Sequence, residues 1–109
     1  MAQARKEIKS VVLKYISNLQ SLGISVQKVI LFGSQTKGTF EKDSDIDIAV
    51  VSKEFEKMGL WKKATYLGRA AREIPYPIGA IGFSPSQLKK FKQGTILDEI
   101  IRNGVEVKI

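Results

Sequence analysis

The sequence predicts an α+β fold in which a small mixed β-sheet is covered by helices mainly on one face. Three apolar, β-rich runs, 26–32, 46–51 and 78–83, predict strands, and residues 105–109 alternate as a last, half-exposed strand. Segments with apolar residues at three- and four-residue intervals separate these runs and predict helices. A chain of 109 residues can bury one modest core, so we expect a single domain, residues 1–109, with one site.

The first two long helices follow from amphipathic spacing. Apolar residues over 8–22 recur on one helical face, and Gly23 is expected to end that helix. A second helix over 58–73 should stop before the two prolines that follow it, because proline forces the preceding chain out of the helical conformation. We expect Trp61 to pack on this second helix.

Two further helices are indicated by their caps. Ser84-Pro85-Ser86-Gln87 is a capping box with proline in the first helical position, so a helix should begin there and stop near Gly94. Thr95 is expected to cap another helix, which Gly104 ends. The predicted order is helix, strand, short helix, strand, helix, strand, one or two helices, and strand.

The composition excludes several kinds of chemistry. Neither Cys nor His occurs, which removes disulfides, thiolate nucleophiles, Cys/His zinc sites and imidazole catalysis, so any metal must have oxygen ligands. Lys and Arg outnumber Asp and Glu by 18 to 11, and the net charge of +7 favours anionic ligands, solubility or thermal stability. No apolar run is long enough to span a bilayer, and residues 1–9 lack a signal core. We therefore expect a cytoplasmic protein.

Two carboxylates interrupt the second apolar run. Asp45 and Asp47 stand two residues apart, and residues two apart on a strand share a face, whereas Ile46 and Ile48 face the other way. Carboxylates about 6 to 7 Å apart repel each other unless a cation compensates them. Mg²⁺ suits such a pair, because it takes oxygen ligands and completes its coordination with water and phosphates. An isolated pair of this kind is also compatible with two solvent-facing acids on an edge strand.

A glycine-serine pair follows the first strand run. Gly33 lets the backbone turn and approach a ligand, and Ser34 can cap a short helix whose first N–H groups favour phosphate oxygens. Lys37 can add a second positive contact. Taken alone, this segment is also compatible with a plain helix cap and a solvated lysine.

Together these elements form a spaced motif. Gly33-Ser34 is followed by ten residues, 35–44, and then by Asp45-Ile46-Asp47 on a predicted strand. This pattern, with Gly38 inside the turn, resembles the signature of the DNA-polymerase-β-like nucleotidyltransferase superfamily, and the small size resembles its minimal (MNT) branch. Residues 98–105 are also similar to that branch.

The resemblance implies a reaction in which an acceptor hydroxyl attacks the α-phosphorus of a Mg²⁺-bound nucleoside triphosphate, expected to be ATP, and pyrophosphate leaves. It implies that Asp45 and Asp47 are catalytic and hold metal, with two Mg²⁺ sites in the family. It also implies that Gly33 and Ser34 bind the β- and γ-phosphates, with Lys37 in support. For the minimal branch it implies a helical HEPN-type protein as a partner, which would be the acceptor or the target.

One part of the family pattern is missing. The family normally has a third carboxylate on a neighbouring strand, where it helps to hold one metal and to activate the acceptor hydroxyl. The corresponding run here, 76–83, contains no acid, and Gly79 stands in the expected place. Glu73 is the nearest upstream acid but lies on the predicted helix. Two functions therefore remain open: a nucleotidyltransferase, or a catalytically impaired nucleotide-binding and interaction module, such as the antitoxin-like partner of a HEPN protein.

Overall fold

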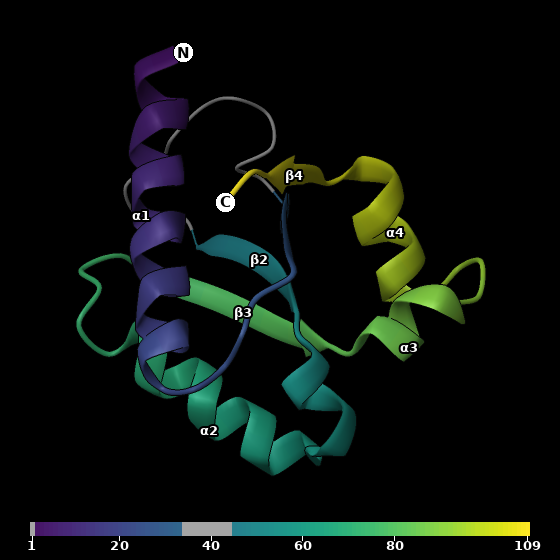
Figure 1. Cartoon of the computed structure of the whole chain (residues 1–109). Helices are drawn as coiled ribbons and strands as arrows, with labels where there is room; N and C mark the ends of the chain where they lie inside the picture. Colours follow the sequence, from purple (N-terminus) through teal and green to yellow (C-terminus); the bar gives the residue numbers. More distant parts are fainter. Residues whose placement is uncertain (1, 34–44) are drawn as a thin grey trace.

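The computed structural model describes residues 2–33 and 45–109, with side chains from residue 7 onward in the first helix (Figure 1). Within these ranges one mixed sheet has the strand order β3-β2-β1-β4. Its strands are β1 (Lys28–Phe32), β2 (Ile46–Val51), β3 (Ile78–Phe83) and β4 (Val105–Val107). β2 lies antiparallel to β1 and parallel to β3, while β4 lies antiparallel to β1. The predicted α+β fold with a mixed sheet is confirmed.

Helices lie on both faces of this sheet, and the two longer ones share one face (Figure 1). The helices are α1 (Ala2–Ser21), α2 (Leu60–Ala71), α3 (Pro85–Lys89) and α4 (Ile96–Asn103), and the short 3₁₀ helix η2 (Lys53–Lys57) follows β2. α1 and α2 cover the first face, whereas α3 and α4 cover part of the second. No helix in the described part of the chain has the length and hydropathy needed to cross a membrane.

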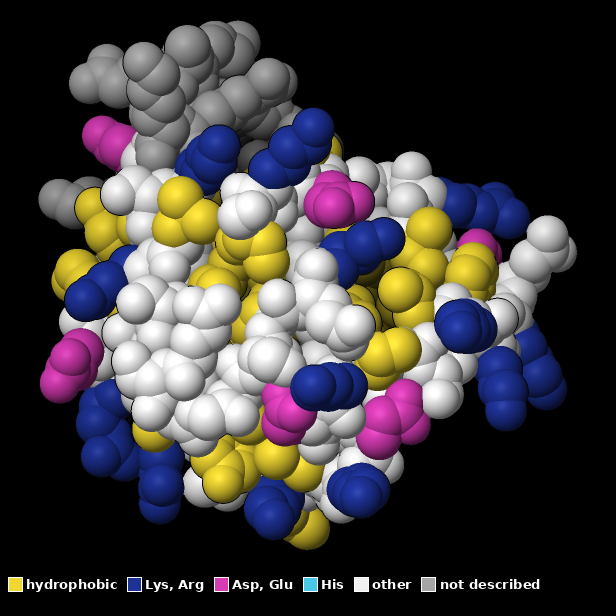
Figure 2. All heavy atoms as spheres, viewed as in Figure 1, with side chains coloured by type: hydrophobic (Ala, Val, Ile, Leu, Met, Phe, Trp, Pro, Cys, Tyr) yellow, Lys and Arg dark blue, Asp and Glu magenta, His cyan; other side chains and the backbone are white. Residues whose placement is uncertain are grey.

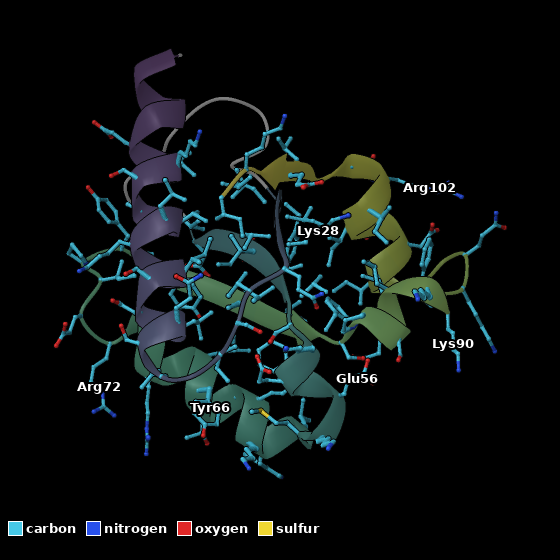
Figure 3. All side chains as sticks on the ribbon, viewed as in Figure 1. Lys28, Glu56, Tyr66, Arg72, Lys90 and Arg102 are labelled. Carbon is cyan, nitrogen blue, oxygen red and sulfur yellow. The ribbon has the colours of Figure 1, made fainter. Side chains whose placement is uncertain are left out.

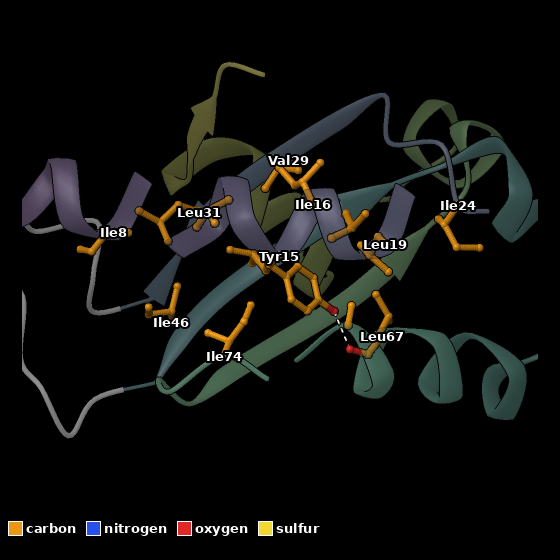
Figure 4. Packing of buried hydrophobic residues seen from close by; sticks show 14 of the residues in the cluster. Ile8, Tyr15, Ile16, Leu19, Ile24, Val29, Leu31, Ile46, Leu67 and Ile74 are labelled. Atoms are coloured by element: carbon orange, nitrogen blue, oxygen red, sulfur yellow. Dashed lines mark hydrogen bonds between the residues drawn. The ribbon is translucent and has the colours of Figure 1, made fainter. Parts of the chain in front are cut away.

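The larger core cluster lies between α1, α2 and the sheet (Figure 4). The apolar face that the spacing predicts for α1 is buried there; its members are Ile8, Val12, Tyr15, Ile16 and Leu19. On β2, alternate residues enter the same core: Ile46, Ile48 and Val50. Because side chains on a strand alternate between faces, the remaining residues of β2 point toward the side of α3 and α4.

Tyr15 joins the two longer helices inside this core. Its hydroxyl donates a hydrogen bond of 2.7 Å to the backbone oxygen of Leu67 on α2 (Figure 4). Burial raises the pKa of the Tyr15 hydroxyl above its ordinary value, so the group stays protonated and remains a donor. Asn18 adds a second link, from its Nδ2 to the backbone oxygen of Ala70 at 2.9 Å. The C-terminal half of α2 is therefore fixed against α1.

We expect Tyr15→Phe to lower the free energy of unfolding by about 1 kcal/mol, since the ring still packs but one buried hydrogen bond is lost. Urea unfolding followed by circular dichroism measures this change. Tyr66→Phe is the matched control, because the Tyr66 side chain on α2 is half-buried. This variant should change the free energy of unfolding by less than about 0.5 kcal/mol. Equal losses in both variants would contradict the role given to the Tyr15 hydrogen bond.

Some details of the sequence prediction are wrong. Trp61 does not pack on the protein: it is 86% exposed, because only the C-terminal half of α2 reaches α1, at Leu67 and Ala70. The helix that begins at the Ser84 capping box ends at Lys89 rather than near Gly94. η2 was not expected; it forms where Ser52 accepts a hydrogen bond from the backbone of Glu54.

Candidate functional site

Asp47 lies on the central strand pair, on the sheet face opposite α1. It belongs to β2, where its register partners are Phe32 at the end of β1 and Gly79 near the start of β3. Its neighbours Ile46 and Ile48 are fully buried in the larger core, so Asp47 must point to the other face. The side chain is half-buried there. The strand context that the sequence predicts for this acid is therefore confirmed.

The Asp47 carboxylate is flanked by two glycines from the neighbouring strands. A Cβ atom built on Gly33, which directly follows β1, would overlap the Oδ2 atom of Asp47 and lie 3.3 Å from its Cγ. A Cβ atom built on Gly79 would lie 2.9 Å from Oδ1. The Asp47 carboxylate therefore packs closely against both positions, and only residues without a side chain fit on either side of it.

The two acids of the motif influence each other. Burial raises the pKa of Asp47 above its ordinary value, and the negative charge of Asp45 raises it further. Asp45 itself is exposed and directly precedes β2. The negative charge of Asp45 thus disfavours the ionised form of Asp47, and a bound cation would relieve that cost. The pair is thus electrostatically suited to a positive ligand.

Only some of the sequence-predicted site residues can be placed. The structure brings Gly33, Asp45 and Asp47 together at one end of β2. Ser34 and Lys37, with the short helix expected after Gly33, lie outside the described residues. Among the residues that the structure describes, no three Asp, Glu, His or Cys side chains form a group that could hold a metal, so Glu73 does not join Asp45 and Asp47.

Gly79 occupies the position that the sequence analysis assigned to the missing third carboxylate. It lies on β3, the parallel neighbour of β2, and is paired in register with Asp47. A side chain at this position would point toward the Asp47 carboxylate, because residues paired across two strands share a face. With glycine at residue 79, the Asp47 carboxylate therefore has no second carboxylate beside it on β3.

We expect Gly33→Ala to destabilise the fold by about 1 to 2 kcal/mol. Gly33 has a φ of 77°, which an L-residue adopts only with strain, and the added methyl group would displace the Asp47 carboxylate. Thermal unfolding measures this effect. Gly68→Ala on α2 is the matched control: its methyl group meets open space, so stability should rise slightly. Equal behaviour of both variants would contradict the role of Gly33.

The fold and this site agree with comparisons to known proteins. The family model of the nucleotidyltransferase domain matches residues 10–106, and the chain belongs to that family. The resemblance noted in the motif, to the polymerase-β-like nucleotidyltransferases and their minimal branch, is confirmed by this match. The class of the protein is therefore established by sequence and fold together.

Two individual relatives are informative. A protein of Methanocaldococcus jannaschii, named as a candidate protein adenylyltransferase, is 34% identical over 83 residues, which are 75% of this chain and 79% of the relative. The crystal structure of a candidate nucleotidyltransferase from Sulfolobus solfataricus superposes with a TM-score of 0.65, covering 96% of this chain and 83% of that one. At 18% sequence identity, the second match shows a common fold.

Proposed function

We propose that this chain binds a Mg²⁺-bound nucleoside triphosphate, ATP in the first instance, and transfers its nucleotidyl group to a hydroxyl of a partner protein. The observation that carries the proposal is the Asp47 carboxylate, which faces the side-chain-free positions of Gly33 and Gly79 and lies within the electrostatic influence of Asp45. Membership of the nucleotidyltransferase family supports nucleotidyl transfer as the reaction class.

The donor atoms fit Mg²⁺ as the metal. Asp45 and Asp47 would hold it, because hard divalent cations prefer carboxylate oxygens and the sequence offers no His or Cys ligand. The raised pKa of Asp47 supports this assignment, since a nearby cation would favour the ionised carboxylate that the protein alone disfavours. When bound, the cation would neutralise charge on the phosphates.

The remaining groups of the chain would position the nucleotide. The turn at Gly33 has a positive φ and no side chain, which lets phosphate oxygens approach the backbone. Ser34 and Lys37 follow it in the sequence and are proposed to contact the β- and γ-phosphates. In the reaction, the acceptor oxygen bonds to the α-phosphorus as the bond to the β-phosphate breaks, pyrophosphate leaves and the hydroxyl proton passes to solvent.

A protein is the acceptor that we favour. The Methanocaldococcus jannaschii relative is named for adenylyl transfer to protein, and it shares 34% identity over most of both chains. A HEPN-type helical protein remains the partner proposed from the resemblance to the minimal branch. Its hydroxyl-bearing side chain would enter beside Asp47, on the face where the sheet carries no long helix.

A second candidate function is favoured by Gly79. Without a carboxylate beside Asp47 on β3, the metal on the acceptor side would be held less firmly than the one carried by the nucleotide. The chain would then bind nucleotide and its partner while transferring slowly or not at all. In that case it would act as a binding and interaction module.

The test uses ATP labelled in the α-phosphate, incubated with Mg²⁺, the purified chain and a lysate of its source organism. Label that becomes attached to a protein hydroxyl, identified by mass spectrometry and absent with Asp47→Asn, supports the transferase. Mg²⁺-dependent ATP binding without attached label supports the binding module. Neither binding nor label would overturn both candidates.

A further inference from the structure

The second face of the sheet is covered less completely than the first. Its core cluster is small and contains one or two residues from each of four elements; these are Ile30, Ala49, Phe83, Leu97 and Ile100. α3 has no buried residue, and the chain between α3 and α4 stands away from the sheet (Figure 1). This arrangement leaves hollows between the short helices.

Two hollows meet at Phe91. The first, of about 460 Å³, is lined at its base by the buried Phe83 and Leu97 and at its walls by Phe91 and Ile96, which are 38% and 57% exposed. The second, of about 280 Å³, lies over β1 and β4 and also includes Phe91. The first hollow has the size of pockets that take up small ligands or large side chains, about 300 to 1,000 Å³. We call the residues that line it the α3–α4 surface.

Lysines surround the apolar part of the α3–α4 surface. Lys90 and Lys92 line the hollow and no Asp or Glu does. In the sequence, Lys89-Lys90-Phe91-Lys92 is a basic run around an aromatic residue. Figure 2 shows hydrophobic side chains among Lys and Arg, with some Asp or Glu, over α3 and α4, and Figure 3 shows Lys90 and Arg102 extending outward there, with Glu56 beside α3. The α3–α4 surface is thus apolar at its centre, and the charged side chains that line it are lysines.

Hydrogen bonds hold this surface in place before any partner binds. The Ser84–Gln87 capping box fixes the start of α3, and the backbone N–H of Ser86 donates to Glu56 on η2 at 3.0 Å. On α4, the buried Asp98 accepts from the backbone of Gly94 at 2.9 Å and from Arg102 at 3.1 Å. A preformed surface loses little conformational entropy when it binds a partner.

We propose that the α3–α4 surface docks an acidic, amphipathic segment of the partner protein. Large apolar side chains of that segment would enter the hollow above Phe83 and Leu97, and its Asp or Glu residues would meet Lys90 and Lys92. Apolar anchors in a pocket supply most of the affinity at protein interfaces, and complementary charges at the rim supply specificity and association rate.

Other occupants fit the observations less well. Membrane binding requires a broad set of protruding apolar side chains, whereas only Phe91 and Ile96 are exposed among the large apolar side chains that line this hollow. A nucleic-acid strand requires aromatic platforms for successive bases, and Phe91 is the one aromatic side chain at the exposed wall of this hollow. A second copy of the chain would carry the same net charge of +7, so repulsion opposes it.

The location of the α3–α4 surface connects it to the candidate site. Phe83 and Gly79 lie on the same strand and point to the same sheet face, four residues apart, so the hollow and Asp47 are separated by roughly 13 Å along the sheet. A partner seated on the surface could therefore present a hydroxyl to the nucleotide. The proposal that the docked protein is also the acceptor rests on the proposed function; the proposal that the surface binds an acidic segment does not.

The test begins with random peptides displayed on phage. They are selected on the wild-type chain without nucleotide and depleted on the double variant Phe91→Ala/Ile96→Ser, whose substitutions are exposed and should leave the fold intact. We expect a consensus with one or two large apolar residues flanked by Asp or Glu. No enrichment, or a consensus without acidic residues, would overturn the inference.

An enriched peptide, labelled with a fluorophore, then gives affinities by anisotropy. Lys90→Glu/Lys92→Glu should weaken binding at least about tenfold, while Lys14→Glu/Lys62→Glu, the same charge change on α1 and α2, should stay within about twofold. Equal weakening by both double variants overturns the inference. So does displacement of the peptide by anionic vesicles or single-stranded oligonucleotides at concentrations below that of the unlabelled peptide.

A separate ATP titration distinguishes this inference from the proposed function. If the peptide binds and ATP does not, the α3–α4 surface keeps its role and the nucleotide site is rejected. If ATP binds and no peptide is selected, the nucleotide site stands and the docking inference is rejected. Leu60→Ser, at an exposed apolar residue on α2, is the matched control for Ile96→Ser and should leave peptide affinity unchanged.

Discussion

Asp47→Asn is expected to weaken Mg²⁺-dependent ATP binding by more than about 100-fold while the fold is kept. The amide has the shape of the carboxylate but no charge for a divalent cation, and Asp47 is the acid that packs between Gly33 and Gly79. Asp45→Asn should have the same direction of effect, since both acids are proposed ligands. Fluorescence anisotropy with a labelled ATP analogue, in Mg²⁺ and in EDTA, measures both variants.

Asp47→Asn is also expected to change the stability of the metal-free chain. Because burial and the charge of Asp45 raise the pKa of Asp47, its ionised form is disfavoured in the folded state. The folded state is less stable once pH rises through the raised pKa, because Asp47 then carries a charge that its surroundings disfavour. The amide that replaces the carboxylate stays neutral at every pH. Asp47→Asn should therefore raise the free energy of unfolding of the metal-free chain at neutral pH, by up to about 1 kcal/mol. Glu73→Gln, which removes an exposed acid outside the site, is the control for both effects. Lost ATP binding in this control would mean that general charge, and not the Asp pair, governs affinity.

Gly79→Asp is expected to raise nucleotidyl transfer by about tenfold or more, because it would place a carboxylate in register with Asp47 on the neighbouring strand. The new Cβ would lie 2.9 Å from Oδ1 of Asp47, so the Asp47 side chain must shift slightly to admit it. In the absence of Mg²⁺ the added charge should lower stability, and Mg²⁺ should restore it. Transfer of the α-phosphate label to the partner protein, and thermal unfolding with and without Mg²⁺, measure these effects.

Gly79→Asn separates charge from shape at the same position. It adds a side chain of equal size next to Asp47 but no third carboxylate, so transfer should not rise. Gly79→Ala tests the added Cβ alone. If the wild-type chain transfers label and the Asp variant transfers it no faster than the Asn variant, the absence of an acid at residue 79 does not limit the reaction, and the binding-module candidate loses its main support.

Much of the fold could be predicted because its local signals are strong. The bounds of β2 and β3 agree with the predicted apolar runs, since polar residues or proline flank both runs. The caps at Ser84 and Thr95 also form as predicted, because a side-chain oxygen at the right spacing binds a free backbone N–H. Such features depend on neighbours in the sequence and need no knowledge of tertiary packing.

The rest depends on contacts between distant segments. The sequence could not show that Gly33 and Gly79 flank the same carboxylate, because this follows from the pairing of β2 with strands on both sides. Trp61 was expected to pack on its helix, yet only the C-terminal half of α2 reaches α1. The hollow at Phe91 likewise depends on how far α3 extends, and that helix ends sooner than its pattern suggested.

The central claim, that Asp45 and Asp47 serve a Mg²⁺-nucleotide site, is tested most directly by calorimetric titration of ATP into the wild-type chain with and without Mg²⁺. This measurement requires neither the acceptor nor the partner. The account predicts saturable heat for one nucleotide per chain in Mg²⁺ and little or none in EDTA. Equal binding in both solutions, or binding in neither, would contradict it.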